Sequence, residues 1–297
     1  MQRARCRSHP EPLSLLHCFG WLISNRYICP KNVNKKTENR VSGLRIAACS
    51  LFLILFVMSA CGQGSSGADA KLESRYLIDV PTAGIIPHGS LALDLDFFQN
   101  GGLLSGLSLG LWNRLVLGIS YGGAGLIGTE SPVWNKTPGF ALKVRLLDET
   151  DFVPAIALGF DSQGKEFYVD RLDRYAIKSM GFFAVVSKNY GAWGFLSFHG
   201  GANYSLERGD GDDDPNFFGG IEKTIGPVAS VLAEYNLGMN DSNRDALGRG
   251  RGYLNFGIRT SIGGGFTIGF NLKDVLKNQQ DASVGNRTVR LEYLRQL

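Results

Sequence analysis

Residues 139–147 read GFALKVRLL. Large apolar residues alternate strictly with Ala, Lys and Arg, and the apolar positions are Phe140, Leu142, Val144 and Leu146. Alternation with a period of two predicts a β-strand with one apolar face. A soluble sheet buries such a face, whereas a membrane barrel turns it toward lipid. The fold therefore depends on which face of this strand meets water.

The rest of the chain repeats this pattern. From Gly89 onward about twelve runs of 7 to 10 residues are predicted as strands, and most of them alternate. Short connections rich in Gly, Asn and Pro separate some of them, at 100–102, 112–113, 188–191 and 226–227. Long polar connections alternate with these, at 122–138, 161–177, 205–216, 237–251 and 273–287. Tight turns at one end and long loops at the other are typical of a membrane β-barrel.

The faces opposite the apolar ones favour the same interpretation. They carry mostly Gly, Ser and Ala, which suit a crowded interior better than a surface in water. Tyr and Trp recur near the predicted strand ends, as in aromatic girdles, at Trp112, Tyr121, Trp193, Tyr204, Tyr235, Tyr253 and Tyr293. We predict an all-β fold, a single antiparallel transmembrane β-barrel of about 12 strands over residues 78–297. The alternative is a soluble β-sandwich with these aromatic residues in its core.

A few charged residues fall on the predicted inner face. Besides Asp94 and Asp96, the lumen-facing set is Lys143, Arg145, Glu222, Glu234, Arg259, Arg290 and Glu292. The two signs are nearly balanced, and charges inside a protein must pair because an unpaired buried charge is costly. This balance favours a narrow or plugged barrel over a strongly ion-selective pore.

Composition excludes several other classes of protein. Glycine supplies 39 of 297 residues, nearly twice the usual share of about 7 %. The net charge of +4 is modest, and no basic stripe interleaved with aromatic residues indicates a nucleic-acid partner. All five cysteines lie at or before Cys61, so the predicted barrel can hold neither a disulfide nor a cysteine-ligated metal.

The start of the chain is predicted to be an export signal. The apolar run LFLILFVM (51–58) is too short for a membrane-spanning helix of about 20 residues. The following VMSACGQGSS resembles a bacterial lipobox, which implies that Cys61 becomes the acylated N-terminus. Gly62 follows it, and the absence of Asp at this position implies sorting to the outer membrane. We expect residues 1–60 to be removed, with the true start near Val41, and residues 61–77 to form a lipidated linker. Cleavage after Ala70 and an uncleaved inner-membrane anchor remain alternatives.

Three motifs invite a chemical interpretation. GGAGLIG (122–128) has the glycine spacing of a dinucleotide site, but no helix is predicted after it. GDGDDDPN (209–216) clusters aspartates that can bind Ca²⁺, although such a run is more typical of a solvated loop tip. Ser197 and His199 share a face, as in a serine hydrolase, yet no third orienting group is evident. We therefore expect no enzyme, no metal and no cofactor.

Four longer segments of the sequence resemble a known protein family. They are DVPTAGIIPHGSLAL (79–93), PAIALGFDSQG (154–164), YAIKSMGFFAVVSKNY (175–190) and DPNFFGGIEKTIGP (214–227). Together they resemble the YjbH-like outer-membrane barrels associated with exopolysaccharide secretion, over most of residues 78–294. The resemblance implies an envelope barrel and a role in polysaccharide export. Members of that family are often larger, so this chain would be a single-barrel relative, and the phrases carry no catalytic residue.

These observations predict a non-enzymatic barrel in the outer membrane of a Gram-negative-type bacterium, for solute passage or polysaccharide export. The alternative is a structural or accessory envelope lipoprotein with a filled, non-conducting barrel. Expected partners are outer-membrane lipid, the barrel-assembly and lipoprotein-sorting machineries and, for export, a polysaccharide.

Overall fold

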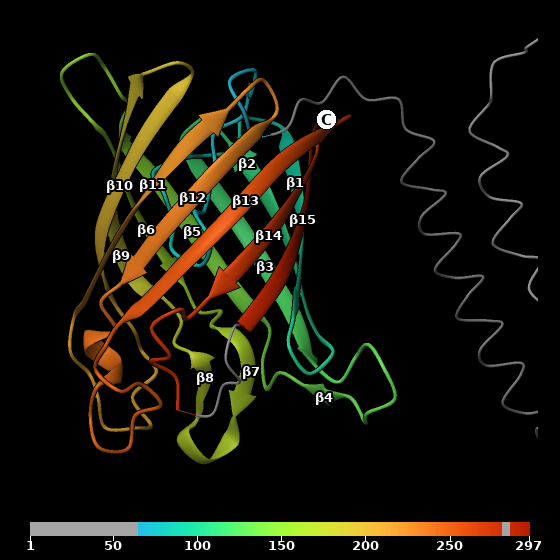
Figure 1. Cartoon of the computed structure of the whole chain (residues 1–297), viewed down its shortest axis with the longest axis vertical. Coiled ribbons are helices and arrows are strands. Elements are labelled where there is room, and N and C mark those ends of the chain that lie inside the picture. The colour runs from blue at the N-terminus through green and yellow to red at the C-terminus, as the bar shows by residue number, and fades with distance from the viewer. Residues whose placement is uncertain (1–64, 281–285) are drawn as a thin grey trace, which may run out of the picture. The chain divides into compact units, whose positions relative to one another are not determined.

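The computed structural model describes residues 65–280 and 286–297 (Figure 1), so Cys61 and the predicted export signal lie outside the described residues. The long strands are β1 (Ser90–Phe98), β2 (Gly102–Leu111), β3 (Leu115–Ala124), β5 (Gly139–Leu147), β6 (Ala155–Asp161), β9 (Gly181–Gly191), β10 (Phe195–Tyr204), β11 (Asn216–Ile225), β12 (Ala229–Asn236), β13 (Tyr253–Gly263), β14 (Phe266–Lys273) and β15 (Asn286–Gln296). The smaller elements are β4 (Val133–Trp134), β7 (Lys165–Val169), β8 (Arg174–Ile177) and two 3₁₀ turns, η1 (Asp170–Leu172) and η2 (Met239–Asp241). Among the described residues, no helix is long and apolar enough to cross a membrane.

The long strands close into an antiparallel barrel. Each pairs with its neighbours in sequence order, and β1 pairs with both β2 and β15, which joins the first strand to the last. The predicted all-β barrel of about 12 strands is therefore confirmed. β4 adds two residues to the edge of β3, and β7 and β8 form a separate hairpin between β6 and β9.

The two ends of the barrel differ. One end, called the turn end here, carries the connections 112–114, 148–154, 192–194, 226–228 and 264–265, together with the C-terminus. The other, called the loop end, carries 125–138, 162–180, 205–215 and 237–252, as Figure 1 shows at the bottom of the view. The turn predicted at 188–191 is wrong by a few residues. β9 runs on to Gly191, and the chain reverses at 192–194, where Trp193 and Gly194 adopt positive φ.

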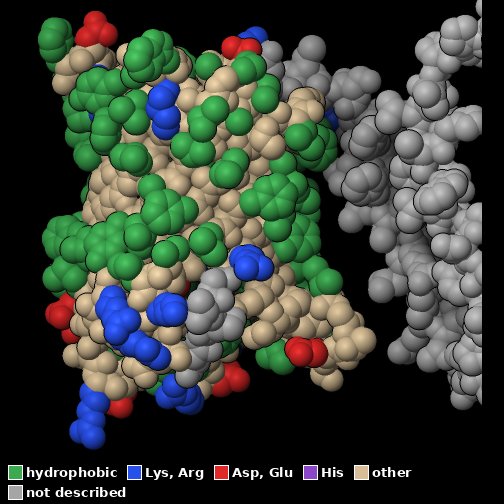
Figure 2. Space-filling view, viewed as in Figure 1, with side chains coloured by type: hydrophobic (Ala, Val, Ile, Leu, Met, Phe, Trp, Pro, Cys, Tyr) green, Lys and Arg blue, Asp and Glu red, His purple; other side chains and the backbone are tan. Residues whose placement is uncertain are grey.

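The apolar face of GFALKVRLL points outward. On β5, Phe140 and Leu142 are 60 % and 41 % exposed, whereas Lys143 and Arg145 are each 7 % exposed. A β-bulge after Arg145 turns both Leu146 and Leu147 to the outside. Figure 2 shows hydrophobic side chains spread over the strands and charged side chains gathered mainly at the loop end. An apolar exterior and a charged interior are the arrangement of a transmembrane barrel.

Aromatic residues near the ends are mostly exposed. Trp112 and Trp193 lie at the turn end, and Tyr121 stacks on Trp134 near the loop end with ring centroids 5.6 Å apart. Tyr253, predicted to belong to a girdle, instead points inward and is 4 % exposed. Its hydroxyl donates a hydrogen bond to Asp241, which gives the polar tip a partner inside the barrel.

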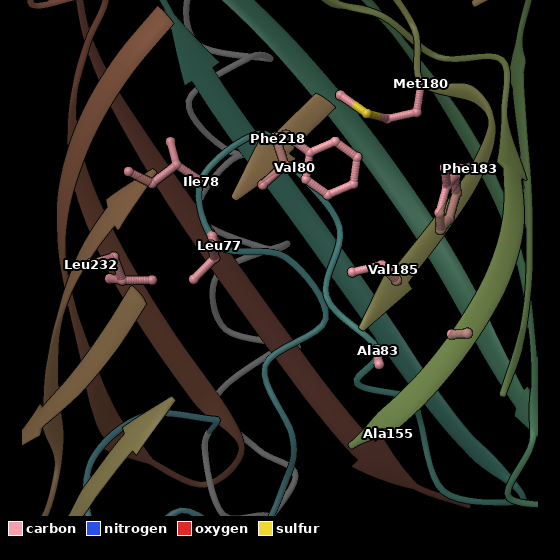
Figure 3. Close-up of a cluster of buried hydrophobic side chains, with 11 residues drawn as sticks. Leu77, Ile78, Val80, Ala83, Ala155, Met180, Phe183, Val185, Phe218 and Leu232 are labelled. Atoms are coloured by element: carbon pink, nitrogen blue, oxygen red, sulfur yellow. The ribbon is translucent and has the colours of Figure 1, made fainter. Parts of the chain in front are cut away.

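Residues 65–89, called the lumen segment here, run through the barrel interior before β1 begins. Residues 65–77 were expected to be a linker and residue 78 the start of the barrel, but the first barrel strand begins only at Ser90. Figure 3 shows four side chains of this segment facing the inner wall, and these are Leu77, Ile78, Val80 and Ala83. They pack against buried wall residues that include Val185, Phe218 and Leu232. The lumen is therefore filled.

Small wall residues make room for the lumen segment. A Cβ added to Gly110 on β2 would lie 2.4 Å from the carbonyl oxygen of Ile86, closer than any real contact. A Cβ on Gly220 of β11 would lie 2.6 Å from Leu77 Cδ1. The glycines on the inner face therefore allow the backbone of this segment to approach the wall closely.

Candidate functional site

The lumen segment enters at the turn end, where it is bonded to the rim. The backbone N–H groups of Ala68 and Asp69 donate to the carbonyl oxygens of Gly226 and Pro227, at 3.0 and 2.9 Å, in the β11–β12 turn. Ser66 Oγ donates to the carbonyl oxygen of Arg259 at 2.9 Å. These bonds fix the entrance of the segment against the β11–β14 side of the barrel.

The tip of the lumen segment, residues 78–80, is held by one carboxylate. Glu234, on β12, accepts hydrogen bonds at Oε2 from the backbone N–H groups of Ile78, Asp79 and Val80, at 2.8, 2.9 and 3.0 Å. Its other oxygen accepts a bond from Asn255 Nδ2 at 2.8 Å. Three converging N–H groups satisfy a buried carboxylate, and charge-assisted bonds of this kind are stronger than neutral ones.

Two cations from the following strands hold the same tip. Lys273 Nζ lies 2.8 Å from Asp79 Oδ2 and 3.2 Å from Glu166 Oε1, so it also joins the tip to the β7–β8 hairpin. Arg290 Nη1 donates to the carbonyl oxygen of Ile78 at 2.9 Å while its Nη2 donates to Asp96 Oδ2 at 2.9 Å. The tip thus offers both its N–H groups and its carbonyl oxygens to charged wall residues.

The parts of the lumen segment before and after the tip contact two more cations, both on β5. Lys143 Nζ donates to the carbonyl oxygens of Arg75 and Thr82, each at 3.2 Å. Arg145 donates to the carbonyl oxygen of Ala83 at 2.7 Å and forms an ion pair with Glu73. Because each cation contacts backbone or carboxylate oxygen, its burial is compensated.

The remaining predicted lumen residues complete the inner lining. Arg75 of the segment lies 2.6 Å from Asp94 and 3.2 Å from Glu292. Arg259 Nη2 donates to the carbonyl oxygen of Tyr76 at 2.9 Å, and its Nη1 lies 4.0 Å from Glu222. The structure thus gives a place to all seven candidate lumen residues, and each is at most 8 % exposed. Six of them contact the lumen segment directly, and Glu222 lies beside Arg259.

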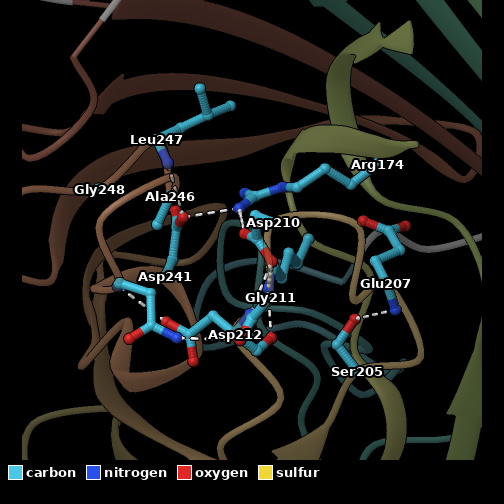
Figure 4. A network of polar contacts seen from close by, with 12 residues as sticks. Arg174, Ser205, Glu207, Asp210, Gly211, Asp212, Asp241, Ala246, Leu247 and Gly248 are labelled. Atoms are coloured by element: carbon cyan, nitrogen blue, oxygen red, sulfur yellow. Dashed lines mark hydrogen bonds and ion pairs between the residues drawn. The ribbon is translucent and has the colours of Figure 1, made fainter. Parts of the chain in front are cut away.

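A second polar network ties the loops together at the loop end (Figure 4). Arg174, fully buried on β8, pairs with Asp210 and, at 2.6 Å, with Asp241. Lys178 Nζ lies 2.8 Å from Asp210 Oδ1. The connections after β6, β10 and β12 are therefore joined by buried ion pairs. Burial raises the pKa of Asp210, but its hydrogen bond to Lys178 and its proximity to Arg174 lower that pKa overall.

The aspartate run 209–216 lies in this network. Among the four clustered aspartates, Asp210 pairs with cations, and Asp212 Oδ2 accepts backbone bonds from Ser242 and Asn243 at 2.8 and 3.0 Å. Asp213 and Asp214 are exposed. Within residues 65–280 and 286–297, no three or more His, Cys, Asp or Glu side chains are grouped as metal ligands.

Ser197 and His199 do not form a nucleophile–base pair with each other. The Ser197 hydroxyl donates to Asn189 Oδ1, and His199 Nδ1 lies 2.7 Å from Ser187 Oγ on the neighbouring strand β9. Ser187 Oγ also accepts the backbone N–H of Ala83 at 2.9 Å, so this hydroxyl attaches the lumen segment to the wall. The geometry supports a structural role for these side chains.

Sequence reasoning missed the partners inside the lumen segment, above all Arg75, Tyr76 and Asp79. The sequence around Asp79 lacks strand alternation, so nothing in it predicts a segment that enters the lumen. One available signal was the nearly balanced set of inward charges, which needs partners that a water-filled lumen does not supply.

No protein-family model matches the chain, and no curated protein matches it. Among solved structures, a KdgM porin is similar at a TM-score of 0.42 and 10 % identity, over 70 % of this chain and 99 % of that chain. A NanC porin is similar at a TM-score of 0.41 and 11 % identity, with the same shares covered. At these scores the likeness carries no functional weight, and membership of the YjbH-like family stays a prediction.

Proposed function

We propose that the protein is a non-enzymatic outer-membrane barrel for solute passage, and that the lumen segment holds it closed in the state described here. The apolar exterior supports membrane insertion, and short turns on one end with long loops on the other support an orientation with the turn end toward the periplasm. The single observation that supports a closed barrel is that the backbone N–H groups of Ile78, Asp79 and Val80 all donate hydrogen bonds to Glu234.

The filled lumen also favours a second candidate, an accessory envelope barrel that conducts nothing. The two proposals differ in whether the lumen segment can move aside and let a solute pass through the barrel. Most of its bonds to the wall are polar and made to charged side chains, so water can replace them when the segment moves. A purely structural filling gains more from apolar packing than from buried charge. The polysaccharide substrate that the family resemblance implied stays a prediction.

Planar-bilayer recording of the refolded full chain tests passage. The variant Glu234→Gln replaces the charged acceptor of three N–H groups by a neutral one. Glu130→Gln, at an exposed position in the connection 125–138, is the control for the same change away from the lumen. We expect low conductance from the wild type and the control, and a several-fold higher conductance from Glu234→Gln. No current from any of the three, with a heat-modifiable gel band as proof of folding, would leave the accessory barrel as the function.

Localisation has a separate test. Fractionation of the producing cells should place the heat-modifiable band in the outer membrane. Its recovery with soluble periplasmic protein would contradict the membrane assignment.

A further inference from the structure

Three cavities lie between the lumen segment and the barrel wall. The first has a volume of about 250 Å³ and is lined by residues that include Ser74 and Arg145. The second, of about 20 Å³, is lined by Arg75 and Lys143 among others. The third, of about 50 Å³, is lined by residues that include Gly106.

Strand register puts these cavities in a row along the barrel. On β5, which runs from the loop end at Gly139 to the turn end at Leu147, Arg145 lines the first cavity, Lys143 the second, and Ala141 the second and third. Ser74 and Tyr76 follow the same order on the lumen segment, with Ser74 at the first cavity and Tyr76 at the last two. The row therefore runs from the turn end toward the loop end.

Part of the wall beside the second and third cavities is made of small residues. Ser108, Gly118 and Ala141 are cross-strand neighbours on β2, β3 and β5. A Cβ added to Gly106 would find its nearest neighbouring atom 3.8 Å away, so the cavity has room there. On the β9–β12 side, Val185, Phe218 and Leu232 pack against the lumen segment, and the first cavity reaches this side at residues that include Ser187, His199 and Glu222.

The last two cavities meet at four residues that line both, Tyr76, Ser108, Ala141 and Asp161, and Tyr76 has the largest side chain of the four. Four cations surround its ring at 5.4 to 5.9 Å from the centroid, and they are Arg75, Lys143, Lys165 and Arg290. Arg75 is 3 % exposed and lines the second cavity, and its Nε has no hydrogen-bond partner among the described residues. A buried donor without a partner is costly, which indicates that the cavity admits a polar occupant such as water or an ion.

We propose that passage follows this row of cavities and that the Tyr76 ring is its constriction. The inference rests on the proposed function, because it specifies where solute crosses the filled lumen and what limits its size. A cavity of 20 Å³ has room for about one water molecule. In the described state the path is therefore closed to solutes larger than water at this point, and passage requires the ring to move aside.

Bilayer recording of the full chain in potassium chloride tests the path. Tyr76→Ser removes the ring and should raise the single-channel conductance several-fold, whereas Tyr76→Phe keeps the ring and should leave the conductance near that of the wild type. Adding Gly106→Val to Tyr76→Ser should reverse the increase by filling the third cavity. Gly200→Val is the control, because Gly200 on β10 has a similar clearance of 3.9 Å but shares the outer face of its strand with the exposed Phe198. A heat-modifiable band confirms that each variant folds.

The outcomes separate this inference from the proposed function. If Glu234→Gln conducts but Tyr76→Ser conducts no more than the wild type, the path is wrong and passage itself stands. The path is also overturned if Gly106→Val and Gly200→Val have the same effect on Tyr76→Ser. If neither Glu234→Gln nor Tyr76→Ser conducts, the proposed function fails and the path fails with it.

Discussion

The backbone N–H of Val80 donates a 3.0 Å hydrogen bond to Glu234 Oε2, and both residues are almost completely buried. The bond joins the lumen segment to β12 at a position nearer the loop end than the turn end. The segment therefore reaches through most of the barrel rather than resting on its rim.

Weakening this acceptor should loosen the tip of the segment first. In Glu234→Gln the three N–H groups lose a charged acceptor, because a neutral amide oxygen forms weaker bonds. We expect faster hydrogen exchange at Ile78, Asp79 and Val80, measured by mass spectrometry on protein in lipid. Glu130→Gln should leave their exchange unchanged. Equal exchange rates in the wild type and Glu234→Gln would contradict this attachment.

Arg174 should contribute strongly to the stability of the loop end. Arg174→Met leaves Asp210 and Asp241 without their shared cation, and breaking a buried pair in this way costs about 3–5 kcal/mol. The free energy of unfolding in urea, followed by loss of the heat-modifiable band, should fall by that amount. Lys136→Met removes an exposed ion pair with Asp173 and should change nothing measurable. Similar losses in the two variants would refute the distinction.

Glu207 predicts a pH dependence at the same end. Burial raises the pKa of Glu207 to about 7 from its usual 4.5, although its hydrogen bond from the Tyr175 N–H opposes the shift. Between these values the folded state binds the proton more tightly than the unfolded chain. The free energy of unfolding should therefore fall as pH rises from about 4.5 to about 7. Glu207→Gln should flatten the profile in this window, and an unchanged slope would exclude Glu207 as its source.

The rim contacts bear on processing of the N-terminus. Cleavage after Ala70 would remove Ala68 and Asp69, which bond to the β11–β12 turn. We propose that the mature chain begins before Ser65, in keeping with lipidation at Cys61. Labelled palmitate should be incorporated by the wild type and not by Cys61→Ala. A mature N-terminal peptide that begins at Lys71 would contradict the proposal.

The barrel could be predicted from the sequence because its signal is local and repeated. Alternation on each strand states which side chains share a face, and GFALKVRLL contains both a lipid face and a charged face within nine residues. The alternation of short and long connections then predicts that one end of the barrel carries tight turns and the other carries long loops. The strand limits near Gly191 could not be predicted, since the residues at the end of a strand and in its turn have similar composition.

The filling of the lumen could not be derived in the same way. Residues 65–89 have no period, and their stability depends on partners as distant in sequence as Glu234 and Arg290. Balanced inward charge indicated a narrow or plugged interior but not which segment would fill it. Only the closed barrel brings the cations of β5 and β15 to the same short stretch of backbone.

The central claim is that the lumen segment closes the barrel, and replacing that segment tests it most directly. A full chain in which residues 71–84 are exchanged for a Gly/Ser sequence of equal length keeps the rim contacts and β1. It loses the apolar side chains that pack on the wall and the ion pairs of Glu73, Arg75 and Asp79. The flexible backbone that remains no longer holds three N–H groups in place at Glu234. In planar bilayers we predict a large, steady conductance from this variant and a much smaller one from the wild type. Equal conductance from the two folded proteins would contradict the account.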